Sequence, residues 1–440
     1  MKVLKFGGTS VGSAERIKDV ANIIIPQGKN VIVLSAMSGV TNMLIEICSY
    51  IRNNEAILAE QAITILSQKY IETIRNLFSE DNNRQAAAVK AMEESNKRIR
   101  SYIGNRFRNE DEKIVLAQGE LMSTMLMHLY LHSLGVNSAL LSALDFMRKS
   151  YNGEPDKEYI TKHTNDILFR NSKADIYITQ GFICRDCLGK IDNLERGGSD
   201  YTASLIGAAI KADEIQIWTD IDGLHNNDPR FVENTSPVRQ LSFDEASELA
   251  YFGAKILHPT CILPAKQHNI PVKLLNTMQP SASGTLIGDI PDLPATIKAV
   301  AAKDNIKVIS VKSDRLLLSY GFLHRVFEIF KDHTTAIDMI STSEVSVSVA
   351  IDNGKELDNI IKDLKKCGSV SVDEDMSIVC IVGNLHWNKC GLEAVVLKAL
   401  EEIPVRMISY GGSNCNISIV IKACDKVKAL NLLSKNLFYN

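Results

Sequence analysis

The first forty residues constrain the fold most strongly, because they alternate strand-like and helix-like patterns. Residues 2–6 and the stretch NVIVLSAMSG at 30–39 are short and apolar, as buried strands are. Between them, SAERIKDVANIII has apolar residues at helical spacing, with Ser13 placed as an N-cap. A strand–helix–strand unit of this kind is typical of a parallel sheet covered by helices. We therefore expect an α/β fold for the N-terminal part of the chain.

The same alternation continues to about residue 290. Residues 53–109 are polar and nearly free of glycine and proline, which predicts long exposed helices. The stretch KIVLAQGELMSTMLMHLYLHSLG at 113–135 reads as a strand, a turn and a buried helix. Strands are expected at SALLSA, ADIYITQGFI and EIQIWTD, and the two prolines of IPDLPATIK predict a linker.

The tail, from about residue 297, has a different pattern. A strand at IKVISVKS, a helix at GFLHRVFEIFKDH, an alternating strand at VSVSVAID, a helix at ELDNIIKDLKK and a strand at SIVCIVG follow one another. A similar set begins at GLEAVVLKALEE and runs through VRMISYGG and NISIVIK to a last helix. The tail is therefore predicted to hold two copies of a small α+β unit.

Composition excludes several classes of function. The chain has 440 residues, enough for two or three domains, and a formal net charge of −3, so nothing draws it generally toward nucleic acid or an anionic membrane. Nine cysteines are scattered, and Cys184 and Cys187 form a lone C-x-x-C without a second pair, so we expect neither a metal site nor a redox role there. We find no leader peptide and no apolar run of membrane-spanning length, and we expect a cytoplasmic protein.

A glycine pair directly follows the first strand, in KFGGTS at residues 5–10. Glycines at a strand end let a phosphate approach backbone N–H groups, and a following helix N-terminus favours the same anion. Lys5 would add a positive charge. On these residues alone, an ordinary tight turn with an exposed lysine is an equally good interpretation.

A second glycine pair favours the anion-binding interpretation. In LERGGSDYTASLIG, Arg196, Gly197, Gly198, Ser199 and Asp200 open a helix, and arginine suits bidentate capture of a carboxylate. Plain N-capping would also explain the Ser-Asp pair. Two further stretches are weaker signals. In WTDIDGLHNNDPR, Thr219 and Asp220 end a strand, where ligands bind in open α/β sheets. In YFGAKILHP, Lys255 follows a small-residue pair, and only the other stretches raise its rank.

Taken together, KFGGTSVG, VLSAMSGVTN, GELMSTMLM, RGGSDYTA, WTDIDG…NDPR and GAKILHP resemble the aspartate kinase family. The resemblance implies an amino acid kinase fold, an open and mainly parallel sheet sandwiched by helices, followed by two ferredoxin-like ACT domains. It implies a catalytic domain at 1–292, a first ACT domain at 308–382, and a second, interleaved one made of 297–307 and 383–440.

The family transfers the γ-phosphoryl group of MgATP to the β-carboxylate of L-aspartate. A free aspartate side chain has a pKa of about 3.9 and is already a nucleophile at neutral pH, so the obstacle is repulsion between anions. Cations and positioning should therefore carry catalysis, with Mg²⁺ held mainly through ATP.

The resemblance assigns roles to particular residues. The catalytic set is Lys5, Asp200 and Lys255, with Gly7, Gly8, Gly197 and Gly198 as phosphate loops. The aspartate-binding set is Ser35, Thr41, Glu120, Phe182, Arg196 and Ser199. The nucleotide-binding set is Thr219, Asp220, His225, Asp228 and Arg230.

Three residues depart from the family pattern and bear on substrate affinity. Glu195 stands where glycine is common before RGGSD, His225 where a tyrosine often packs, and Asp222 where proline is more usual. Glu195 would either weaken an anion site or point to solvent.

The tail resembles the lysine-sensitive, monofunctional type of the family. The implied effector residues are Leu316, Phe322, Ile337, Asp338, Thr342, Ser343 and Glu344. Leu316 replaces a more usual methionine and Ala336 a more usual serine. These two replacements bear on whether the effector is lysine or threonine. ACT units have a sheet edge to cover, so we expect a homodimer through the tail and leave a tetramer open.

Two other functions remain as alternatives at this point. One is another member of the amino acid kinase fold, acting on glutamate or acetylglutamate. The other is a non-catalytic amino-acid sensor that keeps the kinase half as a scaffold. The presence of Lys5, Asp200 and Lys255 speaks against the sensor.

Overall fold

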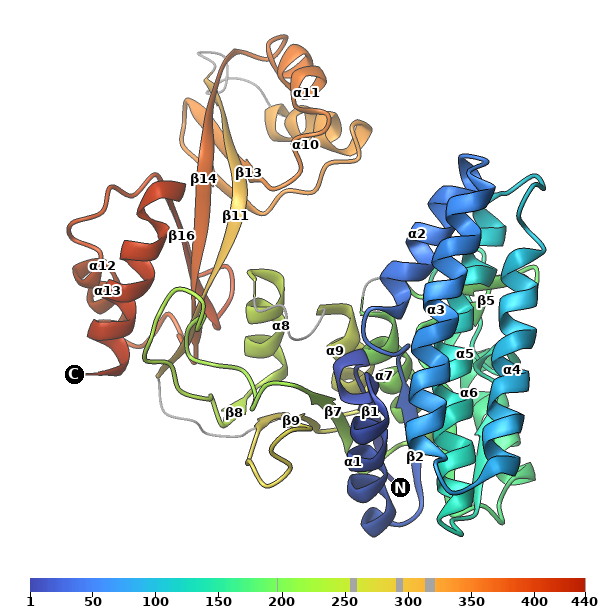
Figure 1. Ribbon diagram of the computed structural model, residues 1–440. Coiled ribbons are helices and arrows are strands. Elements are labelled where there is room, and N and C mark those ends of the chain that lie inside the picture. The colour runs from blue at the N-terminus through green and yellow to red at the C-terminus, as the bar shows by residue number, and fades with distance from the viewer. Residues whose placement is uncertain (196, 254–258, 290–295, 313–320, 440) are drawn as a thin grey trace. The chain divides into compact units, whose positions relative to one another are not determined.

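The computed structural model describes residues 1–195, 197–253, 259–289, 296–312 and 321–439. These residues form two compact units (Figure 1). The first consists of Met1–Leu224 and Leu257–Asp289, and the second of His225–Ile256 and Ile290–Asn440. Residues 225–256 therefore group with the tail, although they fall within the range 1–292 expected for the catalytic domain.

The first unit is built on a mainly parallel sheet. Its strands lie in the order β3 (Ser138–Leu141), β4 (Ile176–Gln180), β2 (Asn30–Leu34), β1 (Val3–Phe6), β7 (Ile215–Thr219), β9 (Val272–Asn276) and β10 (Thr285–Ile287). Neighbouring strands are parallel except for β9 and β10, which are antiparallel. Lys5 lies opposite Val33 on one side and Ile217 on the other, at the centre of the sheet.

Helices cover both faces of this sheet. They are α1 (Ala14–Ile24), α2 (Val40–Arg52), α3 (Ala56–Leu77), α4 (Asn82–Arg100), α5 (Asn109–Ser133), α6 (Lys157–Arg170), α7 (Gly198–Ile210) and α9 (Pro259–Gln267). Leu4 and Phe6 belong to a core shared with α1 to α5. Side chains alternate along a strand, so Lys5 points to the opposite face, where α7 contacts β1.

Short elements complete the first unit. Three 3-10 helices lie at Gly8–Val11, Ile25–Gln27 and Ala143–Asp145, and a small hairpin pairs β5 (Ile183–Arg185) with β6 (Ile191–Asn193). The predicted N-cap of α1 is confirmed, because the Ser13 hydroxyl accepts a hydrogen bond from the Arg16 N–H at 3.4 Å.

The strand predicted at the start of 113–135 is wrong, since α5 is one continuous helix. Glu110, Asp111 and Glu112 lie in its first turn, where they complement the helix dipole, and Asp111 accepts from the Arg108 N–H. The apolar run KIVLA is therefore one turn of a buried helix. By length and composition α5 could cross a membrane, contrary to the expectation above, but 67% of its apolar window is buried within the protein.

The second unit contains a six-stranded antiparallel sheet in the order β12-β13-β11-β14-β16-β15. The strands are β11 (Ile297–Lys312), β12 (Met339–Thr342), β13 (Ser346–Ile351), β14 (Ser369–Gly383), β15 (Met407–Tyr410) and β16 (Asn416–Lys422). The other elements are β8 (Gln240–Leu241), α8 (Phe243–Tyr251), α10 (Phe322–Asp332), α11 (Leu357–Leu364), α12 (Leu392–Ala399), a 3-10 helix at Ala423–Asp425 and α13 (Lys426–Phe438).

Two long strands, β11 and β14, run through both repeats of the tail (Figure 1). Residues 307–312 of β11 pair with β13, whereas 297–303 pair with 378–383 of β14. Val379 and Ile381 pack with α12 and α13 in one core, and a second core surrounds α10 and α11. The range 308–382 predicted for the first ACT domain therefore includes Val379 and Ile381, which pack in the core of the second repeat. The domain ranges themselves remain a prediction.

Candidate active site

A buried ion pair joins the first strand to the glycine-started helix. Lys5 Nζ lies 2.6 Å from Asp200 Oδ1, and the two side chains are only 11% and 13% exposed. Lys5 comes from the central strand β1 and Asp200 from the first turn of α7. Nearly 200 residues of sequence separate them, so the fold assembles a charged group at the carboxyl end of the sheet, where ligands bind in such folds.

Both glycine pairs lie where a side chain would collide. A Cβ on Gly8 would lie 2.8 Å from the Ala36 carbonyl oxygen, and one on Gly198 would lie 2.6 Å from the Phe182 ring. Gly197 has φ of +68° and caps α7, a conformation that favours glycine. A Cβ on Gly7 would lie 3.7 Å from Lys5 Nζ, so this backbone runs beside the ion pair.

Glu120 brings a buried carboxylate to the end of β2. It is 4% exposed and accepts a hydrogen bond from the Ala36 N–H at 3.2 Å. Burial raises the pKa of Glu120 to about 7, and the Ala36 N–H acts in the opposite direction. A buried anion of this kind calls for a cationic partner.

Three other predicted aspartate ligands, Ser35, Thr41 and Ser199, lie on separate elements of the first unit. Ser35 directly follows β2, and its carbonyl accepts a hydrogen bond from the Ser123 hydroxyl of α5 at 2.7 Å. Thr41 is half-buried in the first turn of α2. Ser199 is buried in α7 and packs against Gly181, where an added Cβ would lie 2.5 Å from the serine side chain.

Thr202 links two of these elements, and the sequence analysis did not single it out. Phe182 has φ of +67°, a left-handed conformation that costs free energy for a side chain of this size. Its N–H donates to Thr202 Oγ1 at 3.1 Å, and the same hydroxyl donates to the Gly198 carbonyl at 2.8 Å. The only signal in the sequence was its place within RGGSDYTA.

We predict that Thr202→Val raises the KM for the acceptor about tenfold, whereas Thr202→Ser stays near wild type. Valine keeps the volume of threonine but leaves the Phe182 N–H without its acceptor, a loss of about 1–3 kcal/mol. Steady-state kinetics of the two variants provides the comparison. Equal KM values for the valine and serine variants would show that the hydroxyl does not position this backbone.

The predicted nucleotide residues fall into two groups. Thr219 ends β7 in the first unit, and its hydroxyl donates to the neighbouring Asp220 Oδ1 at 3.1 Å. In the second unit, Arg230 donates through Nε to Asp228 Oδ1 at 2.9 Å and through a terminal nitrogen to Oδ2 at 2.5 Å. Burial raises the pKa of Asp228, but the hydrogen bonds from Arg230 outweigh it and lower that pKa overall. His225 Nδ1 lies 2.8 Å from the Thr235 hydroxyl.

The predicted effector residues surround the start and end of β12. Asp338 precedes this strand, and its side chain is 1% exposed. Phe322 is buried at the start of α10, and Ile337 packs against the same core. Thr342, Ser343 and Glu344 are exposed at the other end of β12. There the Ser343 N–H donates to the Ser346 carbonyl at 2.8 Å, and the two serine hydroxyls lie 2.8 Å apart.

Three predicted residues, Arg196, Lys255 and Leu316, lie outside the described residues. Of the departures from the family pattern, Glu195 has an exposed side chain and φ of +59°. That backbone conformation suits glycine, the residue usual in the family at this position. The side chain points to solvent, which is one of the two outcomes expected for it.

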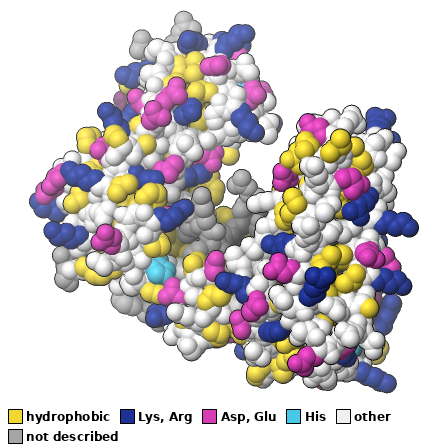
Figure 2. Space-filling view, viewed as in Figure 1, with side chains coloured by type: hydrophobic (Ala, Val, Ile, Leu, Met, Phe, Trp, Pro, Cys, Tyr) yellow, Lys and Arg dark blue, Asp and Glu magenta, His cyan; other side chains and the backbone are white. Residues whose placement is uncertain are grey.

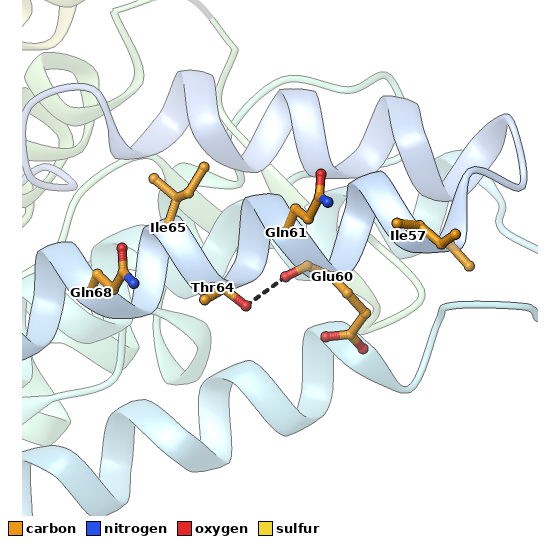
Figure 3. A pocket seen from close by; sticks show the side chains of 7 residues that line it. Ile57, Glu60, Gln61, Thr64, Ile65 and Gln68 are labelled. Carbon is orange, nitrogen blue, oxygen red and sulfur yellow. Dashed lines mark hydrogen bonds between the residues drawn. The ribbon is translucent and has the colours of Figure 1, made fainter.

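A hollow on the helix α3 contains none of the predicted site residues. This shallow hollow of about 670 Å³ is lined by Ala56, Ile57, Glu60, Gln61, Thr64, Ile65 and Gln68 (Figure 3). Its one drawn hydrogen bond runs from the Thr64 hydroxyl to the Glu60 carbonyl, an ordinary contact within a helix. On the face shown in Figure 2, acidic and basic side chains are interspersed and form no broad basic surface.

Comparison with known proteins finds two families along the chain. Residues 1–276 match the Amino acid kinase family, and residues 379–437 match the ACT domain. These matches and the Lys5–Asp200 site define the class of protein: an amino acid kinase joined to ACT domains. The predicted fold class is therefore confirmed.

Full-length relatives narrow this class. The chain is 32% identical to Lysine-sensitive aspartokinase 3 of Escherichia coli over 450 residues, covering 99% of both chains. It is 32% identical to the chloroplastic Aspartokinase 1 of Arabidopsis thaliana, covering 99% of this chain and 80% of that protein. The solved structure of E. coli aspartokinase III in complex with aspartate and ADP (R-state) matches with a TM-score of 0.86, 30% identity and full coverage of both chains. The lysine and aspartate complex of that enzyme (T-state) matches with a TM-score of 0.78 and 30% identity, covering 100% of this chain and 99% of that one.

This chain belongs to the aspartokinase family. The predicted family and enzyme class are thus confirmed, and the relatives support a kinase that acts on the aspartate carboxyl group over a non-catalytic sensor.

Proposed function

We propose that this protein phosphorylates the β-carboxylate of L-aspartate with MgATP, giving 4-phospho-L-aspartate and ADP, and that lysine inhibits it. The observation that carries the proposal is the buried Lys5–Asp200 ion pair beside the glycine loops. A carboxylate oxygen of aspartate attacks the γ-phosphorus, the bond to the β,γ-bridging oxygen breaks, and ADP leaves. No proton need be removed from the nucleophile, because its carboxylate is ionised at neutral pH.

In this proposal Lys5 neutralises charge on the transferring phosphoryl group, and Asp200 holds the lysine side chain in place. Backbone N–H groups beside Gly7, Gly8, Gly197 and Gly198 would line the phosphoryl path. Gly8 and Gly198 leave no room for a Cβ, Gly197 has left-handed backbone, and Gly7 lies beside Lys5 Nζ. Lys255 would supply a second cation. The expected gain from such preorganised donors is about 10²–10³ each in kcat.

The acceptor aspartate is assigned to the Glu120 region. Its ammonium group would pair with the buried Glu120 carboxylate, and a substrate carboxylate with Arg196. Ser35, Thr41, Phe182 and Ser199 would complete the pocket. A zwitterion with an extra carboxylate requires one fixed anion and one fixed cation, and Glu120 supplies the anion.

Nucleotide binding is assigned to the residues around the end of β7 and the Asp228–Arg230 pair. These residues are Thr219, Asp220, His225, Asp228 and Arg230. No group of three His, Cys, Asp or Glu side chains is placed to hold a metal ion within the described part of the chain. Mg²⁺ therefore fits best as a part of the substrate, held by phosphate oxygens and water.

Regulation is assigned to the first ACT repeat. Lysine would bind near Leu316, Phe322, Ile337, Asp338, Thr342, Ser343 and Glu344, and inhibit by stabilising an inactive arrangement. Because β12 is at an edge of the six-stranded sheet, pairing with a second chain through the tail would cover it, giving a homodimer. A cytoplasmic location is expected for an enzyme of amino-acid biosynthesis.

An assay of ADP release with aspartate, with glutamate and without an acceptor tests this function. We expect release that depends on aspartate, stays near background with glutamate, and falls when lysine is titrated in. Threonine, titrated next, should inhibit less. Lysine binding without any aspartate-dependent ADP release would instead favour the sensor.

A further inference from the structure

Asp338 already holds an ammonium group that belongs to the chain itself. Lys303 Nζ of β11 lies 2.7 Å from Asp338 Oδ1, and the Tyr251 hydroxyl of α8 donates to the same oxygen at 2.6 Å. The Lys303 ammonium also lies 2.9 Å from Asp352 Oδ2 and 4.4 Å from the centre of the Tyr251 ring. Two carboxylates and an aromatic face thus enclose one alkylammonium group, and all four residues belong to the second unit.

The second oxygen of the same carboxylate has no such partner. Asp338 Oδ2 is buried and accepts no hydrogen bond from any residue that the structure describes, although the side chain is 1% exposed. A buried carboxylate oxygen without a donor is costly, so its place in a native structure calls for an explanation. Binding a second cation at Oδ2 would satisfy it.

We propose that Lys303 competes, from within the chain, with a free amino acid for Asp338. Lys303 would thereby set the affinity of this site for an amino acid that carries a second ammonium group. The inference rests on the effector function proposed above. With Lys303 present, the cluster of Lys303, Asp338 and Asp352 carries a formal charge of about −1, whereas without the lysine charge it would carry about −2. The incoming ammonium group must share Asp338 with Lys303 or displace it, and repulsion between the two cations weakens binding.

Tyr251 keeps the carboxylate oriented while this exchange takes place. Its hydroxyl donates to Oδ1, and its pKa is raised by burial and by that hydrogen bond, so it stays a neutral donor at physiological pH. The Tyr251 hydrogen bond therefore holds the Asp338 carboxylate in place whether or not Lys303 is paired with it.

The test measures lysine binding to the full-length protein by isothermal titration calorimetry, in wild type, Lys303→Gln and Lys303→Arg. Glutamine keeps a hydrogen-bond donor for Asp338 and removes the charge, whereas arginine keeps the charge. We expect the glutamine variant to bind lysine about tenfold more tightly and the arginine variant to stay within about twofold of wild type. Circular dichroism spectra and melting curves establish that both variants are folded, and Lys303→Met provides a second uncharged variant.

The outcomes separate this inference from the proposed function. If wild type binds lysine and both uncharged variants bind it equally well or more weakly, the proposed role of Lys303 is overturned and the effector proposal stands. Tighter binding by the arginine variant as well as the uncharged ones would also overturn it, because the charge would not be the cause. If wild type and every variant bind no lysine, the effector proposal itself is overturned, and this inference with it.

Discussion

Lys5→Met is expected to lower the kcat of the aspartate-dependent reaction by about 100- to 1,000-fold, the effect of removing one preorganised positive donor from a developing anion. Lys5 is 11% exposed and pairs with Asp200 at 2.6 Å, so its ammonium group is held in a largely dehydrated place where charge acts strongly. Methionine keeps an unbranched side chain that is one atom shorter, and it removes the charge together with the N–H donors of the ammonium group. The measurement is kcat at saturating ATP and aspartate.

The same substitution leaves Asp200 buried without its partner, which costs about 3–5 kcal/mol of stability. The double variant Lys5→Met with Asp200→Asn removes both charges and should recover much of this loss in urea unfolding. It should not recover activity, because the cation is still absent. Recovery of kcat in the double variant would show that the pair serves the fold and not the phosphoryl group.

A matched control lies three residues away in the sequence. Lys2 Nζ is 3.3 Å from Glu214, and its side chain is 41% exposed, so this surface pair contributes little. Lys2→Met should leave kcat within about twofold of wild type. An equal loss of activity in both single variants would contradict a specific role for Lys5.

Glu120→Gln is expected to raise the KM for aspartate by about 10- to 100-fold, because the substrate ammonium group would then bind a neutral amide oxygen in place of a carboxylate. The effect should also depend on pH. The pKa of Glu120 is raised to about 7 by burial, so the free enzyme carries the carboxylate only above that pH. In wild type, kcat/KM for aspartate should rise between about pH 6 and pH 8, and in the glutamine variant this rise should disappear.

Stability should change in the opposite sense. Because the folded carboxyl group stays protonated up to about pH 7 while the unfolded one ionises near pH 4.3, the folded state binds the proton more tightly. This contribution to stability is full below about pH 4 and is lost as pH rises through 7. Glu120→Gln should therefore be more stable than wild type at pH 8, by about 3–4 kcal/mol at most, and by only about 1 kcal/mol at pH 5.

Glu110→Gln is the control on the same helix. Glu110 is 56% exposed and pairs with Lys190 at the surface, so its replacement should change neither the KM for aspartate nor the pH profile. Urea unfolding at pH 5 and pH 8, with kinetics over the same range, provides both readouts. A pH profile that survives in Glu120→Gln would assign the ionisation to another group.

Local pattern was sufficient for much of the fold. Alternating strands and helices predicted the parallel sheet, and Ser13 predicted the start of α1. The helix predicted at GFLHRVFEIFKDH is α10, which buries Phe322, Val326 and Phe330. Where local signals conflicted, prediction failed. The run KIVLA has strand-like composition, but α5 continues through it because packing against the core outweighs its intrinsic preference.

What the sequence by itself determined, then, is the type and order of the elements, the family and the residues worth testing, because side-chain periodicity, glycine positions and capping act over a few residues. Only the tertiary structure decided which charges meet. Lys5 and Asp200, Phe182 and Thr202, and Lys303, Tyr251 and Asp338 are brought together by strand pairing and helix packing. Burial of a charge is favourable only where a partner is present, and that partner comes from whichever distant segment the fold places beside it.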